Sequence, residues 1–322
     1  MKYKIYKFEF AGGVHFGKSS LEDSEYTFYA DTLFSALCKE AVKEGEDFLK
    51  NFVACAKQRK FVMSDAFPYI GDKYFLPKPM LKIESDNNGD SKIKKAYKKL
   101  KYIDAEKIES YLSGEYDVIS EEQELSKLGV AQLRTMASVR GLEETMPFRT
   151  GVYYFNEENG LYIIVGFEDE VIEAQFEDLL SRVSFEGIGG KRSSGLGRFE
   201  INFGKIPETI KNRLLENDNS NTLVTLSVSL PTDGEIKDIM EEAQYTLIKR
   251  SGFVSSETFS DRCLRKRDLY VFKSGACFKE RFKGDIYDVS DGQGKHSVYR
   301  YAIPMFLEVW LWRIFWKDMK EH

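Results

Sequence analysis

Hydrophobic and polar residues in the first half of the chain predict a mixture of strands and helices. Apolar and charged residues alternate over 3–10, which indicates a strand. Apolar residues between 31 and 45 fall on one helical face, so we expect a helix there with Asp31 as its N-cap. Two strands within 152–167 then precede a helix whose apolar stripe occupies 171–183.

The second half repeats this order of elements. Apolar and hydroxyl residues alternate over 224–230, a short helix is expected at 236–240, and a strand returns at 245–254. Strand, helix and strand in both halves favour an α+β fold of two small units with antiparallel sheets over one doubly wound domain. We place the two domains at 1–205 and 206–322.

Between about residues 84 and 149 the composition changes. A stretch rich in Asn, Asp and Gly is followed by six lysines from Lys92 to Lys101, so we expect an insertion in the first domain. The lysine run is more simply explained as the solvated face of a helix than as a binding site.

Composition limits the possible functions. The chain has 322 residues, 42% of them hydrophobic, which is enough for a substantial core and two domains. Its formal net charge of −5 argues against a uniformly basic nucleic-acid binder, so any contact with nucleic acid must be local. Four scattered cysteines and three histidines form no zinc motif, and we expect no metal, no cofactor and no small-molecule substrate.

Without a signal-peptide pattern or a membrane span, a cytoplasmic location is expected.

One loop stands out for its chemistry. Residues 187–198 contain five glycines, two serines and the cations Lys191, Arg192 and Arg198. Glycines permit positive φ and close approach, so several backbone N–H groups could converge on an anion while the cations and hydroxyls add contacts. A Walker loop is excluded, because Phe185 and Arg192 occupy two of its required positions. Arg192 also breaks the glycine pattern of a dinucleotide-binding loop. Two interpretations remain: a loop that binds a phosphate backbone, or a flexible turn.

Two further segments offer candidate contacts. His15 lies between glycines and beside Phe16, where its imidazole could stack on a base or bond a phosphate, with Lys18 supplying charge. The alternative is a histidine in a surface loop. Lys249 and Arg250 precede Ser251 and Gly252, where a backbone could approach nucleic acid closely, although a solvated strand end explains them too. The basic residues of 262–267 are predicted first as a solvated loop and second as an RNA contact.

Several segments together resemble a known family. The loop Gly12–Gly17 after the first strand, the helix start Tyr29–Leu37, the glycine loop and Lys249–Ser255 are similar to the RAMP superfamily of CRISPR-associated proteins. Within it the chain resembles the fourth subunits of Csm (type III-A) effector complexes, along its whole length. The resemblance implies tandem ferredoxin-like (RRM-like) domains, with a thumb-like insertion in the first.

The resemblance also implies a function. Such subunits hold the 5′ handle of the CRISPR RNA (crRNA), cap a backbone built by another RAMP subunit and dock a large polymerase-like subunit in antiviral defence, without cutting RNA. Lys191 and its neighbours would then grip phosphates, and Phe148 with Arg149 of the insertion would wedge beside the RNA. On this basis we expect RNA contacts from His15, Lys18, Gly189, Gly190, Lys191, Arg192, Ser193, Ser194, Gly197, Arg198, Lys249, Arg250, Ser251, Phe148 and Arg149.

An enzyme is the main alternative. A RAMP endoribonuclease could process repeat RNA with His15 as general acid or base and with Lys191 or Arg192 stabilising the pentavalent phosphate. No second general acid or base stands out near that loop in the sequence. A polymerase-like palm is disfavoured, because no pair of metal-binding carboxylates occurs at a strand turn.

Overall fold

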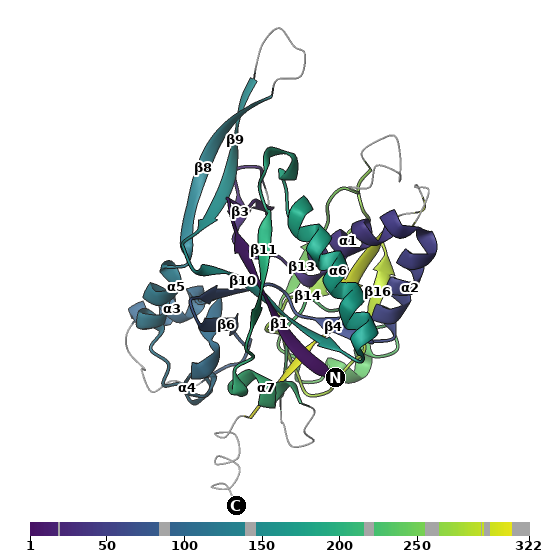
Figure 1. The fold of residues 1–322 in the computed structure, drawn as a ribbon. Coiled ribbons are helices and arrows are strands. Elements are labelled where there is room, and N and C mark those ends of the chain that lie inside the picture. Colours follow the sequence, from purple (N-terminus) through teal and green to yellow (C-terminus); the bar gives the residue numbers. More distant parts are fainter. Residues whose placement is uncertain are drawn as a thin grey trace, which may run out of the picture.

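The structure, a computed structural model, describes residues 1–18, 20–83, 91–138, 146–215, 222–254, 264–290, 292 and 297–310. Within these ranges, every pair of labelled strands is antiparallel, and helices pack against the sheets (Figure 1). The predicted α+β class with antiparallel sheets is confirmed.

The main sheet has seven strands in the order β11-β1-β10-β5-β6-β7, and β4 also pairs with β10. Its strands are β1 (Lys2–Phe10), β4 (Phe61–Met63), β5 (Phe67–Ile70), β6 (Lys73–Pro77), β7 (Tyr102–Asp104), β10 (Asn159–Phe167) and β11 (Phe199–Gly204). With the helices α1 (Ala30–Ala41) and α6 (Glu170–Glu186), the order β1, α1, β4, β10, α6, β11 is the βαββαβ succession of a ferredoxin-like domain.

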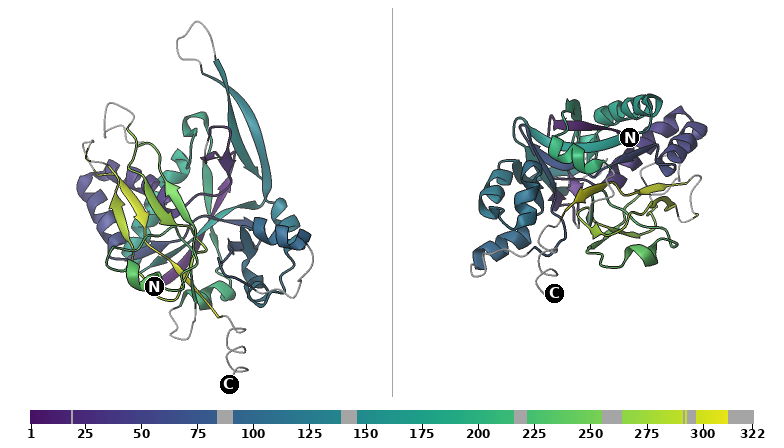
Figure 2. Two further views of the ribbon diagram at one scale, coloured as in Figure 1. Left: turned by 180° about the vertical axis from the view of Figure 1, so that it is seen from behind. Right: turned by 90° about the horizontal axis from the view of Figure 1, so that it is seen from below.

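Both faces of this sheet are covered. Every residue of β10 is buried, as expected for a central strand packed on two sides. Helix α6 lies on one face, and Figure 2 (left) shows the second half, coloured green to yellow, on the other. Phe34 of α1 packs on Tyr301 with ring centroids 5.4 Å apart, and one continuous hydrophobic core includes residues of both halves. Because the core is shared, the boundary at residue 205 stays a prediction.

The second half is built from short strands. Its three-stranded sheet has the order β15-β12-β18, and two hairpins, β13-β14 and β16-β17, accompany it. The bounds are α7 (Glu208–Leu214), β12 (Thr222–Thr225), α8 (Ile236–Ile239), β13 (Leu247–Arg250), β14 (Leu269–Phe272), β15 (Cys277–Phe278), β16 (Asp285–Asp288), β17 (Tyr299–Ala302) and β18 (Phe306–Val309). The strand predicted at 224–230 ends early, because the Leu226 amide bonds the carbonyl of Met305 and the Ser229 amide that of Phe272.

The predicted insertion divides into two parts. Residues 91–126 form α3 (Ser91–Lys99), β7, α4 (Ile108–Ser113) and α5 (Val118–Ser126), and β7 is an edge strand of the main sheet. The second part is a hairpin of β8 (Gly129–Ser138) and β9 (Met146–Phe155), which extends away from the body of the molecule (Figure 1). Only the hairpin therefore projects like a thumb, since the first part buries Ile103, Ile108 and Tyr111 in the core.

Shorter elements complete the chain: β2 (Phe16–Gly17), β3 (Ser24–Glu25), α2 (Glu46–Lys57) and the 3-10 turns Val42–Glu44, Ala105–Lys107 and Arg192–Ser194. None of the helices that the described residues form is long and apolar enough to cross a membrane.

Candidate nucleic-acid interface

A groove of about 720 Å³ lies where the two halves meet. The His15 loop, α1, the glycine loop and the segment 248–253 line it. Two acidic side chains, Glu25 and Asp31, face nine cationic ones: Lys18, Lys39, Lys101, Arg192, Lys249, Arg250, Lys266, Lys273 and Arg300. The lining thus has a formal charge of +7 in a chain of net charge −5. This concentration of charge in a concave surface favours a polyanion.

Ion pairs decide which of these cations are available. Glu25 pairs with Lys18 at 2.8 Å and with Lys101 at 3.1 Å, and Asp268 pairs with Lys249 at 2.7 Å. Four groove cations have no acidic partner within salt-bridge distance among the described residues: Lys39, Arg192, Lys266 and Lys273. Arg192 is the one of these four that is expected first of all to contact RNA, and Lys266 belongs to the segment 262–267, for which RNA contact is the second interpretation.

The glycine loop packs against the first loop rather than forming an open ring of amides. The Gly190 amide donates to the His15 carbonyl at 2.9 Å, and the Gly197 amide donates to the Gly13 carbonyl at 3.0 Å. A Cβ on Gly197 would lie 2.0 Å from the carbonyl oxygen of Ile188, at a φ of +80°. The amides of Gly190 and Gly197 are therefore already bonded within the protein, and these glycines are needed for close packing. The expected RNA contacts of the two residues stay predictions.

Residues of the loop contribute to two different surfaces. Gly189, Gly190 and Arg192 line the groove. Lys191, in the left-handed region at φ +58°, places its Nζ 4.4 Å from the ring centroid of Phe148 on the β8–β9 hairpin. Ser193, Ser194, Arg198 and Arg149 are exposed, outside the set that lines the groove. The loop thus connects the groove to the hairpin.

His15 is buried, with 6% of its surface exposed. Its Nδ1 lies 2.7 Å from the Gly151 carbonyl, and Gly190 covers the ring so closely that a Cβ there would lie 2.7 Å from Cδ2. The protein already covers this ring, which leaves little of it for stacking on a base, and the expected RNA contact of His15 stays a prediction. His15 ties the first loop to the base of the hairpin, and one edge of it lines the groove.

Asp31 lines the groove and joins the two halves. It accepts hydrogen bonds from Arg250 (Nε 2.9 Å, Nη2 2.8 Å) and from Arg300 (Nη1 2.6 Å). Burial alone would raise the pKa of this carboxyl, but Arg250 and Arg300 hold the pKa below its ordinary value. The N-cap expectation for Asp31 is wrong: α1 begins at Ala30 with Tyr29 as its N-cap, two residues earlier than expected, and the Ala30 amide donates to Asp65 at 2.8 Å.

Arg250 and Ser251 are engaged within the protein. The Arg250 guanidinium also lies 4.4 Å from the ring centroid of Tyr29, and the Ser251 carbonyl accepts from Arg300 at 3.5 Å. These contacts hold the guanidinium in one position along the groove wall.

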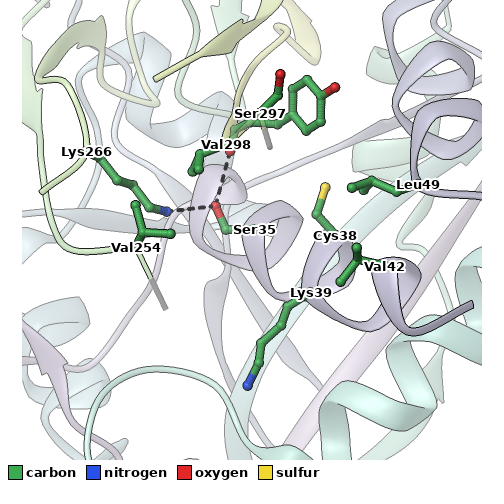
Figure 3. Close-up of a pocket in the computed structure, with 10 residues that line it drawn as sticks. Ser35, Cys38, Lys39, Val42, Leu49, Val254, Lys266, Ser297 and Val298 are labelled. Atoms are coloured by element: carbon green, nitrogen blue, oxygen red, sulfur yellow. Dashed lines mark hydrogen bonds between the residues drawn. The ribbon is translucent and has the colours of Figure 1, made fainter. Parts of the chain in front are cut away.

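Lys266 is not the solvated residue that its sequence context predicts. It is half-buried and lines both the groove and a smaller cavity of about 60 Å³ beside α1 (Figure 3). Its Nζ lies 3.5 Å from the Ser35 hydroxyl, which donates to the Tyr299 carbonyl at 3.4 Å. Burial, together with the charge of Arg300, lowers the pKa of Lys266 to about 8. Arg262 of the same basic cluster lies outside the described residues.

Sequence reasoning missed Lys39, Lys273 and Arg300. No local pattern marks them, because each is separated in sequence from the glycine loop and only the packing of the halves brings it to the groove. Among the residues described, no group of three or more His, Cys, Asp or Glu side chains could hold a metal ion.

Comparisons with known proteins give a consistent result. Residues 218–309 match the family model of the CRISPR Csm4 C-terminal domain. The CRISPR system Cms protein Csm4 of Mycobacterium tuberculosis (strain CDC 1551 / Oshkosh) is 38% identical over 312 residues, covering 95% of this chain and 98% of the relative. The Streptococcus thermophilus protein of the same name is 35% identical over 316 residues, covering 96% and 99%.

Solved structures share the fold. A chain in the crystal structure of a Csm3-Csm4 subcomplex of the type III-A CRISPR-Cas interference complex superposes with a TM-score of 0.66 at 20% identity, covering 95% of this chain and 99% of that one. A chain of a Csm1-Csm4 cassette in complex with pppApA gives a TM-score of 0.59 at 20% identity, covering 96% and 99%. The chain therefore belongs to the Csm4 family, the fourth subunits of Csm (type III-A) CRISPR complexes.

Proposed function

We propose that the chain is a non-catalytic RNA-binding subunit that holds the 5′ handle of the crRNA in the groove between its halves. The observation that carries this proposal is the set of four groove cations without acidic partners in the described part of the chain, Lys39, Arg192, Lys266 and Lys273, in an otherwise acidic protein. Cations spaced along a groove bind a phosphate backbone without reading its bases, which suits an RNA of defined position.

The hairpin supports the same function. Phe148 is half-buried under the Lys191 ammonium, and Arg149 beside it is exposed. An aromatic side chain held by a cation at the end of a basic groove can replace the stacking that a splayed base loses. The proposed path of the RNA runs from the groove past the glycine loop to this hairpin.

Protein partners form the second part of the proposal. Solved structures with this fold are named as complexes of Csm4 with Csm3 and with Csm1. We propose that this chain likewise docks the backbone RAMP subunit and the large polymerase-like subunit in an antiviral defence complex.

A non-catalytic role fits the titratable groups of the groove. His15 is bonded to the Gly151 carbonyl, Asp31 is held by two arginines, and Glu25 is paired with two lysines. A general acid–base pair needs two groups that can exchange protons with the substrate, and these contacts oppose that use. The alternative is a repeat-RNA endoribonuclease with His15 as general acid or base.

RNA retention in the assembled complex tests the binding role. The double variant Lys39→Ala/Arg192→Ala should weaken retention and reduce the slope of log affinity against log salt by about one unit for each phosphate that is no longer neutralised. The matched control is Lys205→Ala/Lys237→Ala, which removes the same charge from exposed positions outside the groove. Equal retention and equal salt slopes in both variants would refute RNA binding in the groove.

A cleavage assay on repeat RNA in the absence of metal tests the enzyme alternative. We expect no product from the complex with or without His15→Ala. Product that the intact chain forms and the His15→Ala variant does not would establish the nuclease instead.

A further inference from the structure

Lys266 lies where two hollows of the molecule adjoin. It lines both the groove and the cavity of about 60 Å³ beside α1, as Ser35 and Lys39 also do. The Lys266 amide donates to the Gly252 carbonyl at 2.8 Å, and the amide of the next residue donates to the Val289 carbonyl at 2.9 Å. These bonds anchor the backbone, and the Lys266 Nζ lies 3.5 Å from the Ser35 hydroxyl (Figure 3). The amine is therefore held at the junction of the two hollows.

The surroundings of this amine disfavour its charged form. No acidic side chain in the described part of the chain lies within salt-bridge distance of it. Burial and the charges of Arg300 and Arg250 lower its pKa to about 8, although Asp31 acts in the opposite direction. The Cys38 thiol, which lines the same cavity, stays neutral because burial raises its pKa.

A neutral lysine amine is a nucleophile. With a pKa of about 8, roughly a tenth of the molecules carry a neutral amine at Lys266 at pH 7, about 200 times the fraction for an ordinary lysine. Desolvation and a neighbouring cation are the two means by which proteins activate a lysine for attack on a carbon atom. Both are present here.

The cavity limits the reagent that the amine can attack. Four aliphatic side chains contribute to its lining: Val42, Leu49, Val254 and Val298. Its volume of about 60 Å³ has room for a few water molecules, whereas pockets for nucleotides and other cofactors have about 300–1,000 Å³. A reagent in this cavity is therefore very small, and the aliphatic lining favours a neutral, apolar one.

The charges beside the amine limit the product. Arg250 and Arg300 share the single carboxylate of Asp31, so this cluster keeps a net charge of 2 − 1 = +1. An aldehyde would form an iminium ion with Lys266, which keeps a positive charge beside that cluster. Carbon dioxide (CO₂) would form a carbamate, whose negative charge the cluster attracts and to which the Ser35 hydroxyl can donate. CO₂ is also small, neutral and apolar.

We propose that Lys266 is a site of reversible carboxylation by CO₂, with the carbamate lying between the small cavity and the groove. The neutral Nζ attacks the carbon of CO₂, so that an N–C bond forms while one C–O π bond opens to leave a carboxylate. The nitrogen then releases a proton to water. No electrons are transferred, and the side chain changes from a charge of +1 as the ammonium to −1 as the carbamate.

The carbamate also affects the groove, and this consequence rests on the function proposed above. Carboxylation of the ammonium form lowers the formal charge of the groove lining from +7 to +5. A phosphate near Lys266 stabilises the ammonium, whereas CO₂ consumes the neutral amine. RNA and CO₂ therefore compete for the same side chain, and each weakens the other by the same factor.

Chemical trapping tests the site itself. The full chain without RNA is equilibrated with carbon-13 bicarbonate, treated with triethyloxonium ions, which convert a carbamate to a stable ethyl carbamate, and mapped by peptide mass spectrometry. The label on Lys266 should exceed that on the exposed lysines Lys205 and Lys237 by at least about tenfold, because the neutral amine is more abundant. No label on Lys266, or no more than on the two exposed lysines, would overturn the proposal.

Ser35→Ala tests where the carbamate lies. Loss of the hydroxyl should reduce the label on Lys266 by about threefold or more, since one hydrogen bond to the carbamate is removed. Far-UV circular dichroism and thermal unfolding check that the variant is folded. Equal labelling of the parent chain and a folded Ser35→Ala variant would overturn the placement of the carbamate beside the cavity.

The effect on RNA is measured on the assembled complex at constant pH and ionic strength, with bicarbonate in place of chloride. Bicarbonate should weaken RNA retention by about twofold or more in the parent complex but not in Lys266→Arg, because arginine keeps its charge and stays protonated. Labelling of Lys266 that is equal with and without RNA would refute the RNA path past Lys266 and leave the carbamate site standing. Absence of label, with RNA still released by the groove variants, would refute only the carbamate.

Discussion

The Asp31→Asn variant tests whether the buried ion-pair cluster holds the two halves together. In the folded chain the Asp31 carboxylate is 3% exposed and accepts three hydrogen bonds from Arg250 and Arg300. An asparagine can accept from one guanidinium, but it carries no charge and turns an N–H toward the other. The Arg300 guanidinium, whose side chain is 5% exposed, then stays buried without a counterion.

The expected loss is large for a single substitution. Removing one partner of a buried ion pair costs about 3–5 kcal/mol, because the remaining charge is left uncompensated. We therefore expect Asp31→Asn to lower the free energy of unfolding by about 3 kcal/mol or more at pH 7. Equilibrium unfolding in urea, followed by circular dichroism, measures this difference.

Asp268→Asn is the matched control, since it removes the same charge from a carboxylate that pairs with Lys249 at the exposed rim. We expect no measurable loss of stability in that variant. The pH dependence gives a second check. Because the folded-state pKa of Asp31 is lowered, its contribution is complete above its unfolded pKa of about 3.9 and is lost as the pH falls through the folded pKa. A loss no larger than that of Asp268→Asn, or a difference that does not shrink in acid, would refute this assignment.

Three further outcomes are expected. Burial raises the pKa of Asp65 from 3.8 to about 7, so the ionised carboxylate costs stability as the pH rises from about 4 to 7. The free energy of unfolding of Asp65→Asn should therefore rise by roughly 4 kcal/mol relative to that of the parent chain across this pH window, as measured by urea unfolding at several pH values. Gly197→Ala should lower the free energy of unfolding by about 2 kcal/mol or more. The control Gly195→Ala, at a similar φ of +82° but with open space around it, should lower it by only about 1 kcal/mol. Equal losses in the two variants would contradict the packing role of Gly197. Phe148→Ala should leave thermal unfolding unchanged and reduce the protection of the RNA base beside the hairpin in chemical probing of the assembled complex; unchanged protection would argue against the wedge.

Individual helices and strands could be predicted because the apolar periodicity that marks them lies within each segment of the sequence. The helix at 171–183 and the strand at 3–10 appear in the structure as α6 and β1, since apolar periodicity reports which face of an element is buried. The glycine loop between a helix and a strand was also predicted correctly, because glycines and cations cluster there in sequence. The strand predicted at 224–230 was cut short because the residues after 225 bond to two different distant segments.

What each residue of the glycine loop does depended on the tertiary structure. The same glycines that suggested free amides are bonded to the carbonyls of Gly13 and His15, far earlier in the sequence. Lys18 and Lys249, which resemble free cations in sequence, are neutralised by Glu25 and Asp268. Sequence by itself determined the fold class, the family resemblance and a local basic loop in an acidic chain. Only the packing of the two halves decided which cations face a common groove without partners in the described part of the chain, because ion pairing and burial depend on neighbours that are distant in sequence.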